Sequence, residues 1–259
     1  DALLIKAPDV LITSELMHPI RDIEEIHPVR MKKLSDSCYV FDFGRNMAGV
    51  SELTIGGKRG SKVYVKHAER MDKNFNIDMS NIDYHYRPID DSDPFQTDIF
   101  ILSGLKEETF RPLFNYKGFQ YVEVKSTEPI SLTINSLKAY VMCSDVPAVG
   151  MISSSNSLLN KIWKATNRSY LSNLFGYPTD CPQREKNGWT GDAHIAIETG
   201  LYNFDAITLY EKWMRDHEDE QQSDGRLPAI IPTSGWGYDW GNGVDWVSSV
   251  SIVPWTVYL

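Results

Sequence analysis

The chain has 259 residues, of which 42% are hydrophobic and 24% charged, a balance typical of globular proteins that form a core. This composition excludes a disordered tail, a collagen-like rod and a coiled coil. The 26 Lys and Arg against 35 Asp and Glu give a formal net charge of −9, which argues against nucleic acid and anionic membrane surfaces as main partners.

No apolar run approaches the roughly 18 residues that a membrane span needs. The first residues, Asp-Ala-Leu-Leu-Ile-Lys, lack the basic region that opens a signal peptide. We therefore expect no membrane association, and the compartment, cytoplasmic or periplasmic, stays open.

Residues 35–147 are predicted to form a β-sandwich domain after an N-terminal lead-in segment, residues 1–34. Several short runs alternate apolar and polar residues with a period of two, as half-buried strands do: 38–43, 52–55, 61–66, 98–102 and 120–125. Glycine-containing turns are predicted between them at 56–57, 59–60, 103–104 and 117–118. This spacing favours an antiparallel sandwich, with a jelly roll as the alternative.

The stretch from residue 74 to residue 98 interrupts this rhythm with six aspartates. Carboxylates gathered in one loop are ligands that calcium prefers. The ligand spacing of an EF-hand is absent, so a solvated loop is the favoured interpretation. The aspartates are Asp78, Asp83, Asp90, Asp91, Asp93 and Asp98.

Cysteine and histidine patterns indicate no cofactor and no metal site. The three cysteines, Cys38, Cys143 and Cys181, form no Cys-x-x-Cys pair, and the six histidines form no His-Glu-x-x-His motif.

Near residue 150 the period changes from two to that of a helix. Residues 148–175 are predicted to be a linker and a first helix, with an apolar stripe from Ser157 and an N-cap at Ser155 or Asn156. A loop follows at 176–191, then a helix at 192–202, a third helix capped by Asp205, and a last helix near Ser249. The chain stops within an apolar run, so we expect a truncated protein that exposes apolar helix faces.

The densest group of reactive side chains lies in residues 180–193. Asp180, Glu185 and Asp192 bring three carboxylates together with Arg184 and Trp189. Neighbouring carboxylates raise one another's pKa, as a general acid requires, while an arginine and a tryptophan suit the edge and face of a polyol ring. An ordinary surface loop with capping aspartates and an Arg–Glu pair is the alternative.

A second candidate is the loop from Trp236 to Trp246, which carries three Trp, one Tyr and two Asp on a glycine-rich backbone. Exposed aromatic rings on such a loop form a stacking surface for carbohydrate. The alternative is that these rings pack between helices.

Residues 180–193 resemble the signature of bacterial α-L-rhamnosidases, glycoside hydrolase family 78. Further similar segments follow in the family's order at 41–49, 114–123, 156–161, 178–184, 202–205, 224–228 and 252–255. The resemblance implies an antiparallel β-sandwich followed by an (α/α)6 barrel, whose first helices would be residues 176–259. It also implies hydrolysis of terminal α-L-rhamnosides with inversion, with rhamnose-containing glycosides or polysaccharides as partners and a homodimer left open.

The resemblance assigns the general acid to Glu185, which precedes Asp192 by seven residues. The side chains that would hold the sugar are Asp180, Arg184, Trp189, Asp192 and Trp246.

Two features depart from the family pattern. The family's general base, a downstream glutamate, is absent from this chain, and the barrel is incomplete. Where Trp-Gly-Asp-Ala is expected, the chain reads Trp246-Val-Ser-Ser249, so Asp245 would have to substitute for a missing carboxylate. The alternatives are therefore a non-catalytic glycan-binding module, or a related hydrolase acting on another sugar, as Ser248 suggests.

Overall fold

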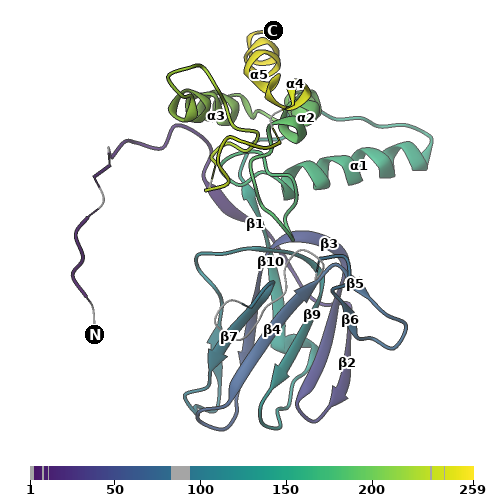
Figure 1. Cartoon of the computed structure of the whole chain (residues 1–259). Helices are drawn as coiled ribbons and strands as arrows, with labels where there is room; N and C mark the ends of the chain where they lie inside the picture. The colour runs from purple at the N-terminus through teal and green to yellow at the C-terminus, as the bar shows by residue number, and fades with distance from the viewer. Residues whose placement is uncertain (1–2, 8, 11, 83–93, 234, 242) are drawn as a thin grey trace.

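The computed structural model describes residues 3–7, 9–10, 12–82, 94–233, 235–241 and 243–259. A β-domain at one end of the molecule is followed by a group of helices at the other (Figure 1). The predicted order, an antiparallel sandwich and then the helices that begin a second domain, is confirmed.

Antiparallel strands make up the β-domain. Its eight-stranded sheet follows the order β1-β10-β3-β9-β4-β7, with β2 and β8 pairing to β3, and β5 and β6 form a separate pair. The strands are β1 (Ile20–Ile26), β2 (Arg30–Ser35), β3 (Cys38–Ile55), β4 (Lys62–Ala68), β5 (Arg70–Met71), β6 (Ile77–Asp78), β7 (Thr97–Ile101), β8 (Glu108–Phe110), β9 (Lys117–Ser126) and β10 (Leu137–Ser144), with a 3-10 turn at Ile134–Ser136 before β10.

Two predicted strands, 38–43 and 52–55, form a single long strand, β3. The β3–β9 register shifts between Asp42 and Met47, where Gly44 has a φ of +75°. This bulge bends the strand without ending it, which lets β3 pair with β2 and β9 at one end and with β10 and β8 at the other.

The turn predicted at residues 117–118 is wrong, because both residues lie in β9. Position 118 requires a glycine for a reason other than a turn. A Cβ there would lie 2.8 Å from the Cβ of Gln183 and 2.9 Å from Cγ of Pro182. The glycine therefore permits a close approach of the loop at 182–183 instead of a change in chain direction.

Strand pairing begins earlier than the sequence pattern indicated. β1 pairs with β10 from Ile20, and β2 pairs with the first part of β3. Both strands are largely exposed along their length, so the apolar alternation that identifies a half-buried strand is weak in them.

The core of the β-domain lies where β3, β4, β9 and β10 face inward. Phe41, Leu53, Val63, Phe119 and Leu137 are each at most 1% exposed. The alternation of buried and exposed positions along β4 and β9 shows the period of two on which the prediction rested.

Five helices follow: α1 (Ser157–Ser172), α2 (Thr190–Asn203), α3 (Ile207–Glu220), α4 (Val244–Val247) and α5 (Ser249–Tyr258). The side chain of Asn156 accepts a hydrogen bond from the backbone N–H of Leu158, so it is the N-cap of α1. Asp205 is not a cap. Ala206 holds the capping position of α3 and Asp205 precedes it, because a turn at Phe204–Ala206 delays the helix by one residue.

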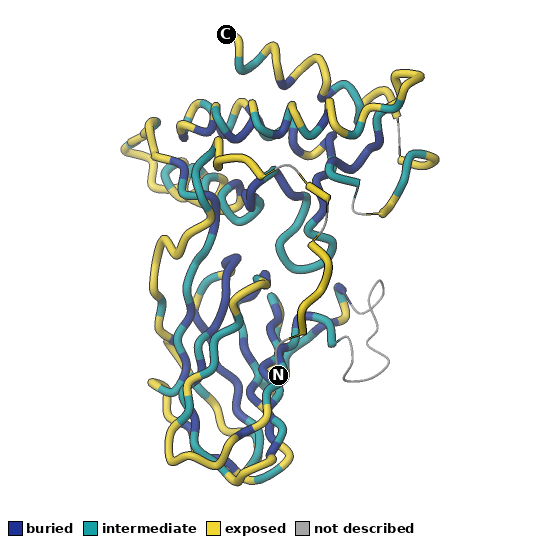
Figure 2. Tube along the Cα trace, turned by 90° about the vertical axis from the view of Figure 1, so that its left-hand side faces the viewer, coloured by how far each residue is buried: buried dark blue, intermediate teal, exposed yellow. Residues whose placement is uncertain are grey.

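A second core lies among the helices and includes Leu174, Ile197, Leu209, Tyr210 and Trp213. The other faces of these helices stay open: Ile195, Tyr202, Trp255 and Leu259 are 60% to 82% exposed. Figure 2 shows this contrast along α5, which is mostly exposed. Within the described residues, no helix is both long and apolar enough to span a bilayer.

Candidate active site

The site is built on residues 180–189, which connect the end of the α1 region to the start of α2. The backbone N–H of Asn187 donates to Oδ1 of Asp180 at 2.9 Å, and the N–H of Asp180 donates to the carbonyl of Asn187 at 3.0 Å. This reciprocal pair closes the loop, which is called the 180–189 loop below. Gly188 fits tightly, because a Cβ there would lie 2.0 Å from the carbonyl oxygen of Ile231.

The three predicted carboxylates lie near one another. Burial raises the pKa of the Asp180 carboxyl above its ordinary value, and the negative charge of Glu185 raises it further. Desolvation and the charge of Glu185 also raise the pKa of Asp192, which projects from the first turn of α2. The carboxylates of Asp180 and Asp192 therefore both sense Glu185, as expected of one shared site.

Protein donors contact both carboxylate oxygens of Glu185. The indole N–H of Trp189 donates to Oε2 at 2.7 Å, and the guanidinium of Arg184 lies 3.2 Å from Oε1. The Nε atom of Arg184 is buried and has no hydrogen-bond partner among the described residues. A buried donor of this kind is costly unless another group accepts from it.

Aromatic rings form one wall of the site. Trp189 packs edge-on against Trp240 at 5.4 Å and against Trp246 at 6.4 Å. A Cβ at Gly191 would lie 2.6 Å from the Trp246 ring, so this glycine makes room for that ring against α2. Trp236 and Trp240 remain about half exposed. Both predicted roles therefore occur in the loop from Trp236 to Trp246. Trp246 packs against α2, and the rings of Trp236 and Trp240 are exposed.

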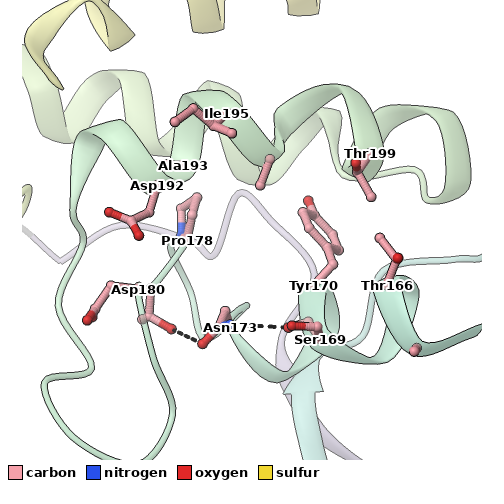
Figure 3. A pocket seen from close by; sticks show the side chains of 13 residues that line it. Thr166, Ser169, Tyr170, Asn173, Pro178, Asp180, Asp192, Ala193, Ile195 and Thr199 are labelled. Carbon is pink, nitrogen blue, oxygen red and sulfur yellow. Dashed lines mark hydrogen bonds between the residues drawn. The ribbon is translucent and has the colours of Figure 1, made fainter. Parts of the chain in front are cut away.

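A pocket of about 580 Å³ opens between α1 and α2. Figure 3 shows Asp180 and Asp192 at one end of it, and Tyr170, Thr166 and Thr199 at the other. Glu185, Arg184 and the tryptophans do not line this pocket. The structure therefore brings together all six predicted site residues around one loop, but only two of them face this cavity.

Sequence reasoning missed two members of the loop. The Cys181 thiol donates to Oδ2 of Asp180 at 2.9 Å and accepts the backbone N–H of Glu185 at 3.2 Å, which links the two acidic residues. The Lys186 ammonium donates to the backbone carbonyl of Tyr116 in the β-domain, and burial lowers its pKa to about 8. A lone cysteine and a loop lysine carry no signal of such roles in the sequence.

Residues 244–248 lie just before α5, where the sequence departs from the family pattern. Polar groups of Asp245 and Ser248 bond within this segment or to His194 instead of to the site carboxylates. The hydroxyl of Ser248 donates to the carbonyl of Val244 within the same turn. Asp245 is exposed, and its backbone carbonyl lies 2.7 Å from Nε2 of His194. No contact of the Asp245 carboxylate with the predicted site residues is found among the described residues, so its role as a substitute stays a prediction.

The aspartate-rich stretch offers little to a cation. Asp83, Asp90, Asp91 and Asp93 lie outside the described residues. Asp78 pairs with Arg70 and Asp98 with Lys117. Within the described part of the chain, no group of three or more His, Cys, Asp or Glu is placed to hold a metal ion.

Comparison with protein-family models divides the chain in two. Residues 32–143 match the bacterial alpha-L-rhamnosidase concanavalin-like domain, and residues 147–259 match the bacterial alpha-L-rhamnosidase 6 hairpin glycosidase domain. A concanavalin-like β-domain followed by the start of a six-hairpin helical domain defines the class: this is a glycosidase fold.

The chain belongs to the bacterial α-L-rhamnosidases of glycoside hydrolase family 78. It is 31% identical over 255 residues to an alpha-L-rhamnosidase of Alteromonas sp. (strain LOR), covering 97% of this chain and 26% of that protein. It thus spans about a quarter of the length of that relative.

Solved structures agree with this assignment. The alpha-L-rhamnosidase from Dictyoglumus thermophilum superposes with a TM-score of 0.83 at 31% identity, covering 94% of this chain and 26% of that one. The Streptomyces avermitilis alpha-L-rhamnosidase complexed with L-rhamnose gives 0.82 at 29% identity, covering 95% and 23%.

Proposed function

We propose that this chain supplies the general acid and part of the sugar site of an inverting α-L-rhamnosidase. Glu185 would protonate the leaving oxygen of a terminal α-L-rhamnoside. An inverting enzyme also needs a base about 6.5–9.5 Å away that activates water. In our proposal that base comes from a part of the protein outside these 259 residues.

The observation that carries the proposal is that the 180–189 loop and the first turn of α2 gather three carboxylates near the unpartnered donors of Arg184 and Trp246. Asp180 and Asp192 can accept hydrogen bonds from sugar hydroxyls. The buried Nε of Arg184 and the buried Nε1 of Trp246 have no partner among the described residues, and they would donate to sugar oxygens once a bound glycoside displaces the side chains that cover them. Trp189 offers an aromatic face for the ring or its methyl group.

One contact must change for the acid to work. Trp189 donates to Oε2 of Glu185, and Arg184 lies beside Oε1, so neither oxygen is free of a protein donor. A bound glycoside would displace one of these contacts so that Glu185 can give its proton to the leaving oxygen. The same arrangement favours the second candidate function, a module that holds a glycan without cleaving it.

Replacing Glu185 by Gln in the complete protein tests the assignment. Hydrolysis of an α-L-rhamnoside with an alkyl leaving group, which must be protonated to depart, should fall by about 10²–10⁴-fold, the usual contribution of a general acid. Near-normal turnover would remove Glu185 from the mechanism. The control is Glu198→Gln, which changes an exposed glutamate of α2 away from the 180–189 loop.

The intact mass of the protein from its source separates the two candidates. A mass well above that of 259 residues together with turnover supports the hydrolase. A mass equal to that of this chain, with no turnover and with retained binding of L-rhamnose, supports the glycan-binding module.

A further inference from the structure

Within the part of the chain that the structure describes, the β-domain contacts the 180–189 loop through the segment from Tyr116 to Gly118. The Lys186 ammonium donates to the backbone carbonyl of Tyr116 at 2.7 Å and lies 4.8 Å from the centre of the Tyr116 ring. That ring is stacked on Phe175 with a centroid distance of 3.6 Å and an interplanar angle of 6°. Tyr116 of the β-domain and Lys186 of the helical domain, 70 positions apart in the chain, are thus joined.

Gly118 brings the same two segments together from the other side. Any side chain at this position would meet Pro182 and Gln183, which come just before Arg184 and Glu185. The φ of Gly118 does not lie in the left-handed region, so an alanine there changes the contact and not the backbone preference.

The backbone of Lys186 is strained. Its φ of +57° lies in the left-handed region, which residues with a Cβ rarely adopt. Local hydrogen bonds surround this residue: its N–H donates to the carbonyl of Cys181 at 3.2 Å, and the Tyr177 hydroxyl donates to its carbonyl at 3.4 Å. A glycine would adopt this conformation at lower cost, so the lysine side chain supplies something that a glycine cannot.

We propose that Lys186 is a positioning residue that holds the general acid in place by tying the 180–189 loop to the backbone of the β-domain at Tyr116. This inference rests on the proposed function, because it assigns Lys186 a role through its neighbour Glu185. The Lys186 side chain ties the loop to the β-domain backbone, while the carboxylate of the adjacent Glu185 accepts a hydrogen bond from Trp189 within the loop. The β-domain then helps to set the geometry of the acid.

Two lysine variants separate the tether from the strain. Lys186→Met keeps the length of the side chain but removes the hydrogen bond, and Lys186→Gly also relieves the strained backbone. In the complete protein, both variants should lower kcat about ten-fold or more and change KM by less than about three-fold, since a small displacement of a catalytic group reduces the rate more than binding. Lys186→Arg, which restores a cationic donor, should recover part of the loss.

Hydrogen exchange over residues 181–190 is the readout that does not depend on turnover. It should be faster in both Lys186 variants and in Gly118→Ala, and unchanged in the control Lys212→Met, which removes a lysine paired with Asp216 on α3. Either unchanged exchange or unchanged kcat in the Lys186 variants would overturn the proposal. So would a fall in activity that only matches a loss of folded protein, measured by thermal unfolding.

The Glu185→Gln variant keeps the two proposals apart. If that variant retains turnover, the proposed function fails, whatever the Lys186 variants do. If it loses turnover while Lys186→Met and Gly118→Ala both keep wild-type kcat, the acid assignment stands and the positioning role of Lys186 is refuted.

Discussion

His67 of the β-domain and the acidic groups at the 180–189 loop are buried titratable groups held in different ways. In the β-domain, His67 is fully buried with both ring nitrogens engaged: Nδ1 lies 3.2 Å from the carbonyl of Gln96 and Nε2 lies 2.9 Å from the Ser51 hydroxyl. At the 180–189 loop, the carboxyls of Asp180 and of Asp192 in α2 have raised pKa values, and the Nε of Arg184 has no partner among the described residues. His67 is a buried titratable group whose hydrogen bonds support the scaffold, whereas acidic groups held close together reduce stability, as is typical of a ligand site.

The largest effect should come from the helical core. Trp213→Ala removes a fully buried ring whose indole N–H donates to the carbonyl of Ile231 at 2.9 Å, and should cost about 3–5 kcal/mol of unfolding free energy. All seven tryptophans lie from Trp163 onward, so their fluorescence follows the helices alone. The transition seen by fluorescence in urea should move to lower concentration.

Phe119→Ala is the matched change in the β-domain, because Phe119 is also fully buried. It should cost a similar amount of unfolding free energy, and far-UV circular dichroism, which follows helices and strands together, should shift while tryptophan fluorescence does not. If both variants shift the fluorescence and the circular dichroism transitions equally, the two cores unfold as one unit and are not separate regions.

His67 should make the β-domain sensitive to acid. Burial lowers its pKa to about 3, while the unfolded chain has the ordinary value near 6.5. Its contribution to stability is fully present above pH 6.5 and is lost as the pH falls toward 3, by up to about 1.4 kcal/mol per pH unit. His67→Gln should flatten this part of the pH profile, measured by urea unfolding; parallel profiles for the two proteins would contradict the argument.

A smaller effect is expected at the contact between α3 and α5. Nδ1 of His217 lies 3.0 Å from the carbonyl of Trp213, so it donates there, and Nε2 accepts from the buried Ser249 hydroxyl at 3.0 Å. Ser249→Ala should therefore cost about 1–2 kcal/mol by leaving a buried acceptor unpaired. Ser251→Ala, at an exposed position of α5, is the control and should change thermal stability little.

The smallest effect should be a gain in stability at the site. The pKa of Asp192 is higher in the folded protein than in the unfolded chain. Its contribution to folding stability is therefore fully present below the pKa of the unfolded chain, and it is lost as the pH rises through the pKa of the folded protein. Asp192→Asn, which stays neutral, should slightly raise the melting temperature at pH 7 and leave it unchanged near pH 3. The same variant should weaken binding of L-rhamnose. A lower melting temperature at pH 7 would mean that the carboxylate supports the fold.

Much of the architecture could be predicted from local pattern. The period-two runs at 61–66 and 120–125 and the helical stripe from Ser157 identified their elements because side-chain burial repeats with the geometry of the backbone. The exposed strands β1 and β2 were missed because their pairing depends on distant β10 and β3. The capping position of α3 was misplaced by one residue because a turn at Phe204, and not the nearest aspartate, decides where the helix begins.

For the site, the sequence by itself determined the set of chemical groups. Asp180, Arg184, Glu185, Trp189 and Asp192 stand within one short segment, and their proximity follows from the chain. Only the tertiary structure decided how they are held. Trp246 reaches α2 because Gly191 leaves space for its ring, and the β-domain reaches the loop because Gly118 and Tyr116 meet Pro182 and Lys186. Such contacts join positions far apart in the chain, and no local pattern records which distant backbone a lysine will bind.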